Sequence, residues 1–344
     1  MQFVDNVNPN PLASRNAADI SLTGIDVSTV DITVKYLGTT VCTFVAEPHS
    51  NALTIRLPDI LSSILRPYFQ EPSGLLGTAE LGTVSIEAYN RQATSPTPWS
   101  RMVFPAGYDS AFHTALMNSY WWTWRPQRCR TFASGKEYIA TILSSGTTPV
   151  YVEATFSDGT TDEEMIHNIG VGDGKKLFAV IDVSYSRVAA LFPDKSIVSY
   201  KVRRSGSAYS QIYEVSHLRP HRVFVFRNSL GMFDTVYATG NISDGASRDI
   251  KTFIGADRAE GISSNDSREK IYVNSGHIDT SGERTLWNEM MLSEDVWEYV
   301  SGNFRKIIID AFDMKLLEAA SASMTFEYHY AKKPAGNGYT KSEI

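Results

Sequence analysis

A glycine-rich segment is the first place in this chain where residue types and spacing suggest a chemical function. Residues 170–175 read Gly-Val-Gly-Asp-Gly-Lys, which resembles a phosphate-binding loop. Such a loop needs a glycine five positions before the glycine that precedes the lysine, and a serine or threonine after the lysine. Ile169 and Lys176 occupy these two positions, and a strand rather than a helix is expected to follow. The segment is therefore interpreted as a glycine-rich β-turn.

Two further groups of polar residues have types that bind metal ions, but their spacing does not fit. Four acids gather within residues 158–164, in an order that differs from the calcium loop of an EF-hand. His217 and His221 have a helical ligand spacing, but Pro220 between them breaks any helix. The Gly-x-Ser-x-Gly motif of hydrolases is absent. We therefore expect no metal site, no cofactor, no catalytic residue and no enzymatic activity.

The densest aromatic segment, Tyr120 to Gln127, has residue types that can stack on a sugar or a base. Its candidate residues are Trp121, Trp122, Trp124 and Arg125. Alternation along an expected strand places Trp122 and Trp124 on one face and Trp121 on the other. Because large aromatics on both faces of a strand favour a core or a subunit interface, we predict that role, with a ligand platform as the alternative.

The composition is that of a folded protein that has no disulfide framework. The 344 residues, 42% of them apolar, exceed one ordinary core and predict two or three domains. The net charge of −6, with both signs interspersed, argues against a nucleic-acid partner. Cys42 and Cys129 are expected to be buried free thiols. The first residues lack a signal-peptide pattern, and no run of roughly 18 apolar residues suggests a membrane span. Folding in a cytosol is therefore expected.

Short alternating segments between turn residues predict a mainly β protein with antiparallel sandwich or barrel-like domains and a few short helices. In the first part of the chain, strands are expected at residues 30–36, 41–46, 52–57, 83–89, 102–104 and 120–127. Later strands are expected at residues 137–143, 150–156, 176–184, 197–203, 210–215, 248–254, 270–277, 305–317 and 322–330. Helices are expected from Pro58 to Pro67 and at residues 109–119, 283–292 and 293–300.

The most informative segment, Arg222 to Gly240, is expected to be a hairpin with its turn at residues 228–231. Both faces of its first strand are apolar, so both are predicted to be covered by protein.

The predicted domain plan has four parts. Residues 1–24 are expected to be an N-terminal arm, 25–130 a first β-rich domain with short helices, 131–331 a second, mostly antiparallel β region of one or two subdomains, and 332–344 a C-terminal tail.

Two of these segments carry a resemblance to a known group of proteins. One is Tyr120 to Arg130, with its Thr-Trp-Arg-Pro-Gln core, together with the following strand at residues 137–143. The other is the hairpin from Phe224 to Gly240. Together they resemble uncharacterised structural proteins of the tail or baseplate of tailed phages and prophages of Bacteroidetes. The resemblance covers about a third of the chain, and its motifs are structural, so it implies no catalytic residue.

This resemblance implies a virion protein that is assembled in the host cytoplasm. Its expected partners are copies of itself in a ring or trimer and other phage tail proteins. The first alternative is a carbohydrate- or receptor-binding module that contacts a host surface glycan. A second alternative, a polysaccharide hydrolase with two carboxylates, stays open because the spacing of such residues is spatial rather than sequential.

Overall fold

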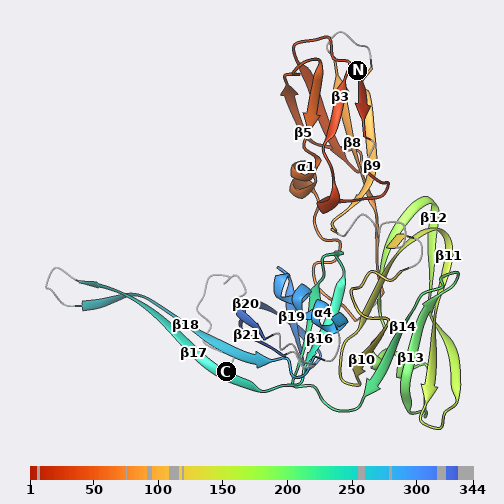
Figure 1. Ribbon diagram of the computed structural model, residues 1–344, viewed down its shortest axis with the longest axis vertical. Helices are drawn as coiled ribbons and strands as arrows, with labels where there is room; N and C mark the ends of the chain where they lie inside the picture. Colours follow the sequence, from red (N-terminus) through yellow and green to blue (C-terminus); the bar gives the residue numbers. More distant parts are fainter. Residues whose placement is uncertain are drawn as a thin grey trace.

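The structure is a computed structural model, and it confirms a mainly β protein built from antiparallel sheets with a few short helices. The residues that it describes are 1–5, 8–74, 76–90, 95–107, 116–117, 120–254, 260–278, 281–315 and 323–331. Figure 1 shows an N-terminal sandwich at the top, a curled sheet at one side below it, and a third sheet from which a long hairpin projects.

The N-terminal sandwich packs two sheets around one core. The smaller sheet has the order β1 (Gln2–Val4), β3 (Ile20–Thr23), β6 (Ala52–Ile55). The larger sheet has the order β2 (Leu12–Ala13), β9 (Thr97–Phe104), β8 (Gly82–Tyr89), β4 (Val30–Tyr36), β5 (Thr39–Ala46). The helix α1 (Leu57–Ile64) and the short 3-10 helix η1 (Ser14–Asn16) complete it. The alternation of Val30, Ile32 and Val34 places these three side chains in the core, as predicted.

The expected N-terminal arm is wrong, because the described residues of the segment 1–24 are part of this sandwich. Leu12, Ile20 and Leu22 are fully buried in its core. The three strands of this segment contain two to four residues each. Strands this short have too few residues for alternation to stand out from the surrounding Asn, Pro and Ser, and their partners are distant in the sequence.

The second sheet curls around its own core. Its order is β10 (Arg128–Phe132), β14 (Ser210–Ser216), β13 (Ile197–Arg204), β11 (Tyr138–Phe156), β12 (Thr161–Asp182), β7 (Gly77–Glu80). The helix α3 (Tyr185–Ala189) follows β12. β11 joins the two expected strands 137–143 and 150–156 into one, whereas β12 begins at Thr161, well before the expected strand 176–184. The two strands are connected by a turn at Asp158-Gly159. The glycine-rich segment 170–175 lies within β12, where a register shift sets residues 172–175 opposite Ser145. It is therefore a bulge rather than a turn.

The third sheet contains the predicted hairpin of residues 222–240. Its order is β16 (Phe233–Ala238), β15 (Arg222–Arg227), β19 (Val296–Val300), β20 (Asn303–Lys315), β21 (Ser323–Tyr330), β18 (Glu260–Asn274), β17 (Ile242–Ile254). The helix α4 (Ser281–Leu292) packs on it. Val225 on one face of β15, and Phe224 and Phe226 on the other, are fully buried in two different clusters. This confirms that both faces are covered.

Two of the predicted elements are wrong. Residues 296–300 form β19 and not a helix, because Val296 and Trp297 pack into two hydrophobic clusters as strand residues, and this packing outweighs the local helix propensity. Residues 120–127 form no strand, although Trp121 and Trp122 still enter opposite cores.

An aromatic core, here termed the central cluster, joins the three parts of the molecule. Its fully or nearly fully buried residues are Ala13, Leu81, Phe104, Ala106, Leu116, Trp122, Tyr138, Ala140, Ile142, Phe178, Val180, Val225, Leu230, Met232, Phe233 and Trp297. Trp122 is at its centre, with its ring 5.3 Å from Phe104 of β9 and 5.0 Å from Phe178 of β12, both edge to face.

The sheets divide the chain differently from the expected domains at 25–130 and 131–331. β7 comes from the first part of the sequence but pairs with β12 in the second sheet. After β9, the chain leaves the N-terminal sandwich and enters the second sheet at β10. The tail 332–344 lies outside the described residues, as does the expected helix 109–119 apart from residues 116–117, which are helical.

Candidate functional site

The candidate platform residues are all occupied by contacts within the chain. Trp121 is 5% exposed in the core of the second sheet, and Trp122 is fully buried in the central cluster. Trp124 is partly buried between the central cluster and the core of the third sheet, and its Nε1 donates to Ser229 Oγ at 2.8 Å. The three rings therefore belong to the core, and none of them lies open as a surface for a sugar or base.

Arg125 is the centre of a buried group of charges. Its side chain is 2% exposed and pairs with Glu137, which precedes β11, and with Asp234 of β16, both fully buried. The Arg125 Nε lies 3.2 Å from Asp234 Oδ1, and a terminal nitrogen donates to the Thr235 carbonyl at 3.3 Å. One cation thus ties the aromatic segment to both lower sheets.

Neutral donors complete the coordination of the two carboxylates. Asn228 Nδ2 donates to Asp234 Oδ2 at 2.7 Å, and the Thr123 hydroxyl donates to the other oxygen. The Tyr237 hydroxyl donates to Glu137 Oε1 at 2.5 Å. These donors offset the excess of one negative charge, which would otherwise be costly to bury.

The environment of this group raises the pKa values of Arg125 and Cys129. Burial lowers the pKa of Arg125, but the interactions with Tyr213 and Asp234 outweigh this effect and raise that pKa above its ordinary value. Burial raises the pKa of the Cys129 thiol to about 11. A permanently charged arginine and an un-ionised thiol offer neither an acid–base catalyst nor a nucleophile at neutral pH.

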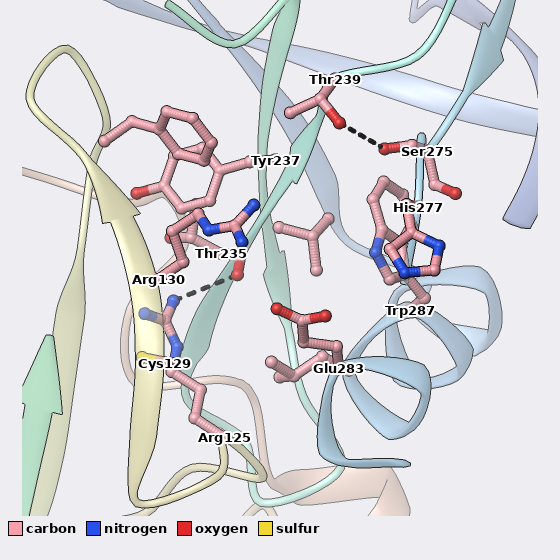
Figure 2. A pocket seen from close by; sticks show the side chains of 13 residues that line it. Arg125, Cys129, Arg130, Thr235, Tyr237, Thr239, Ser275, His277, Glu283 and Trp287 are labelled. Carbon is pink, nitrogen blue, oxygen red and sulfur yellow. Dashed lines mark hydrogen bonds between the residues drawn. The ribbon is translucent and has the colours of Figure 1, made fainter. Parts of the chain in front are cut away.

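A small cavity adjoins this group (Figure 2). Arg125, Cys129 and Arg130 line one side of it, and Glu283 and Trp287 of α4 line the other. Its volume is about 60 Å³. Since pockets for small molecules measure roughly 300–1,000 Å³, this cavity has room for a few water molecules but not for a sugar ring.

The polar residues considered for metal binding instead contact other groups of the protein. At the β11–β12 turn, Glu163 receives a two-pronged contact from Arg203 at 2.7 and 2.8 Å, and Asp162 lies 3.5 Å from Lys195. The His221 ring bonds to the Gly240 carbonyl. No group of three or more His, Cys, Asp or Glu able to hold a metal ion occurs in the described part of the chain.

Both cysteines are free thiols, but they are not equally buried. Cys42 is exposed on β5, which corrects the expectation of two buried thiols, and Cys129 on β10 is partly buried. Cys42 is exposed because β5 is an edge strand that is exposed along nearly its whole length.

Two exposed features of the fold were not recognised from the sequence as sites. The first is β5, whose residues are exposed on both faces at the edge of its sheet. The second is the β17–β18 hairpin, which extends far beyond the third sheet in Figure 1 and is here called the ribbon. Absence of charge in β5 was a sequence signal for the first, whereas nothing local in the sequence indicates that the ribbon leaves its sheet.

Comparisons with known proteins assign no family. No protein-family model matches the chain, and no curated protein matches it. One structural match is a chain of the virion of a native gene transfer agent particle, with a TM-score of 0.21 and 8% identity. It covers 32% of this chain and 92% of that chain. A likeness this low assigns neither a fold nor a function. No helix within the described ranges is long and apolar enough to cross a membrane.

Proposed function

We propose that this chain is a non-enzymatic structural protein of a tailed-phage particle, located in the tail, baseplate or tail tip. It associates with copies of itself and with other tail proteins. The proposal takes its phage context from the resemblance of residues 120–130, 137–143 and 224–240 to tail proteins of phages and prophages of Bacteroidetes. The contacts of the Trp121–Arg125 segment support it as well, because this segment serves as scaffold.

The ribbon is the observation that carries the proposal. β18 pairs with β21 only from Ile271 to Asn274, whereas β17 and β18 pair with each other from residues 242 and 273 out to residues 254 and 260. Beyond its base, the ribbon therefore pairs with no third strand among the residues that the structure describes. A two-stranded hairpin is marginally stable in water. A hairpin as long as the ribbon would be stabilised if another subunit covered it. Symmetric particles provide such repeated contacts between subunits.

The test is to locate the protein in purified particles of the phage whose genome encodes it. Mass spectrometry and immunogold labelling are expected to find it in the tail region. A variant in which Asn-Gly replaces residues 247–268 joins the paired residues Ala246 and Glu269 by a two-residue turn. We expect this variant to keep a cooperative unfolding transition in urea and to be lost from particles. Particles that lack the wild-type protein would refute the proposal.

A carbohydrate-binding module remains the second candidate because of a groove on the third sheet. The groove, about 490 Å³ in volume, crosses β17, β18, β21 and β20. Tyr272, which is 44% exposed, lines it together with Asn274 and Thr325. An exposed ring beside amide and hydroxyl groups is a combination that can stack on and hydrogen-bond a sugar. Binding on a glycan array that Tyr272→Ala abolishes, with the fold intact, would favour this function.

A further inference from the structure

The edge formed by β5 is unlike the other strand edges in the described residues. Proteins protect sheet edges with short strands, charges, bulges or covering elements. β1, β2, β6 and β7 contain two to four residues each. β10 carries Arg128 and Arg130, and β16 lies against β11 and α4. β17 contains four charged residues.

β5 has little of this protection. Its eight residues, Thr-Thr-Val-Cys-Thr-Phe-Val-Ala, include no charge, proline or glycine. A register shift at Val41 leaves a regular segment from Cys42 to Ala46, which pairs with β4 on one side only. Val45 is 57% exposed on one face and Phe44 is 38% exposed on the other. Strands of this composition readily accept another strand.

We propose that β5 pairs antiparallel with β5 of a second copy of this chain, about a two-fold axis at Phe44. This inference rests on the self-association in the proposed function and names its surface. The pairing joins two five-stranded sheets into one continuous sheet across the two copies.

The sequence of β5 matches itself in this register. A two-fold axis perpendicular to the sheet keeps each side chain on its own face, so it can pass through a residue such as Phe44. Phe44 then faces Phe44 of the second copy, and Thr43 faces Val45, an aromatic and a β-branched pair. Cys42 faces Ala46. With no charge from Thr39 to Ala46, no like charges meet. The partly exposed Phe44 rings of the two copies cover each other.

The first test measures the mass of the full chain in solution by sedimentation. The wild type is expected to form a species of twice 38.2 kDa as concentration rises. Phe44→Lys places two ammonium groups opposite each other on the axis and is expected to weaken dimerisation on the order of tenfold or more. Val198→Lys, at another exposed apolar residue (42%), is the control and should dimerise like the wild type.

The second test fixes the register by disulfide formation with diamide as the oxidant. In Ala46→Cys, each introduced thiol faces the native Cys42 of the other copy, so a cross-linked dimer is expected. The double variant Cys42→Ser, Ala46→Cys lacks that partner and should stay uncross-linked. Cross-linking of the wild type through Cys42 would place the axis at Cys42 and overturn the register.

Failure of β5 pairing and failure of the proposed function give different experimental results. A wild type that stays monomeric, or Phe44→Lys that dimerises normally, overturns β5 pairing. Neither result bears on whether the protein is found in phage particles, which the particle analysis decides by itself.

Discussion

At the scale of single residues, Arg125 makes ion pairs with residues of two different sheets, and no sequence pattern around Arg125 indicates these pairs. Its guanidinium makes ion pairs with both Glu137 and Asp234, which lie 97 positions apart in the chain (234 − 137) and are both fully buried. The nearby Arg128 makes an ion pair with Glu214 at 2.6 Å, but both of those side chains are more than half exposed. Substituting each arginine in turn therefore compares the contribution of a buried ion pair to stability with that of an exposed one.

We expect Arg125→Met to lower the free energy of unfolding by about 3–5 kcal/mol, because it leaves two buried carboxylates without a cation. Arg128→Met should change the free energy of unfolding by less than about 1 kcal/mol, since water screens the exposed pair. Urea denaturation of the two variants measures both values. Equal losses would mean that the buried pairs do not stabilise the fold beyond surface pairs.

The two thiols are expected to react at very different rates. Burial raises the pKa of Cys129 to about 11, so at pH 8 only about one Cys129 in a thousand is a thiolate. Its reaction rate should rise about tenfold per pH unit until pH approaches that pKa. Cys42 is exposed. A disulfide reagent should therefore titrate one thiol quickly in the native protein and two in denaturant, and Cys42→Ser should remove the fast reaction. Two fast thiols in the native protein would contradict the environment assigned to Cys129.

At the scale of elements, the β15–β16 hairpin depends on one glycine. Gly231 has φ +82°, and an added Cβ would lie 2.3 Å from the Pro105 carbonyl oxygen. Gly159 in the β11–β12 turn has nearly the same φ, +84°, with open space around it. Gly159→Ala is expected to cost about 1–2 kcal/mol for the left-handed backbone alone.

Gly231→Ala should cost about 1–3 kcal/mol more than Gly159→Ala, because the backbone of Pro105 must also move. The free energy of unfolding of each variant, measured in urea, tests this difference. If the two variants lose the same stability, the close approach of the hairpin to residues 105–107 is not a constraint on the fold.

How far the sequence predicts an element depends on whether its partner is local. In β4, four apolar residues alternate with polar ones, and its partner β5 is the next strand in the sequence. Its predicted bounds, Val30–Tyr36, are those observed. The glycine and asparagine of the 228–231 turn likewise predict their hairpin. β2 instead pairs with β9, some 90 residues away, and no pattern within two residues could indicate it.

The candidate site follows the same rule. The aromatic segment at Trp121–Trp124 was predicted to be core or interface, and its burial is consistent with that composition. Its partners Glu137 and Asp234 lie in other elements, so the sequence gives no sign of the ion pairs. Exposure of β5 depends on which parts of the sandwich the core covers, and no pattern within β5 indicates this.

At the scale of the whole molecule, the central cluster determines whether the parts unfold together. It includes Phe104 from the N-terminal sandwich, Phe178 from the second sheet and Trp297 from the third. Trp122 contacts the first two of these rings directly. Trp121 is also nearly fully buried, but it packs only within the core of the second sheet.

We expect calorimetry of the wild type to show one transition, with calorimetric and van't Hoff enthalpies equal, because the shared core couples the three parts. Trp122→Ala should cost about 3–5 kcal/mol and split the transition in two, since the N-terminal sandwich keeps a separate core of its own. Trp121→Ala removes a similar area from one part alone, so it should lower the melting temperature and leave a single transition. Two transitions in the wild type, or a split caused equally by Trp121→Ala, would show that the central cluster does not couple the parts.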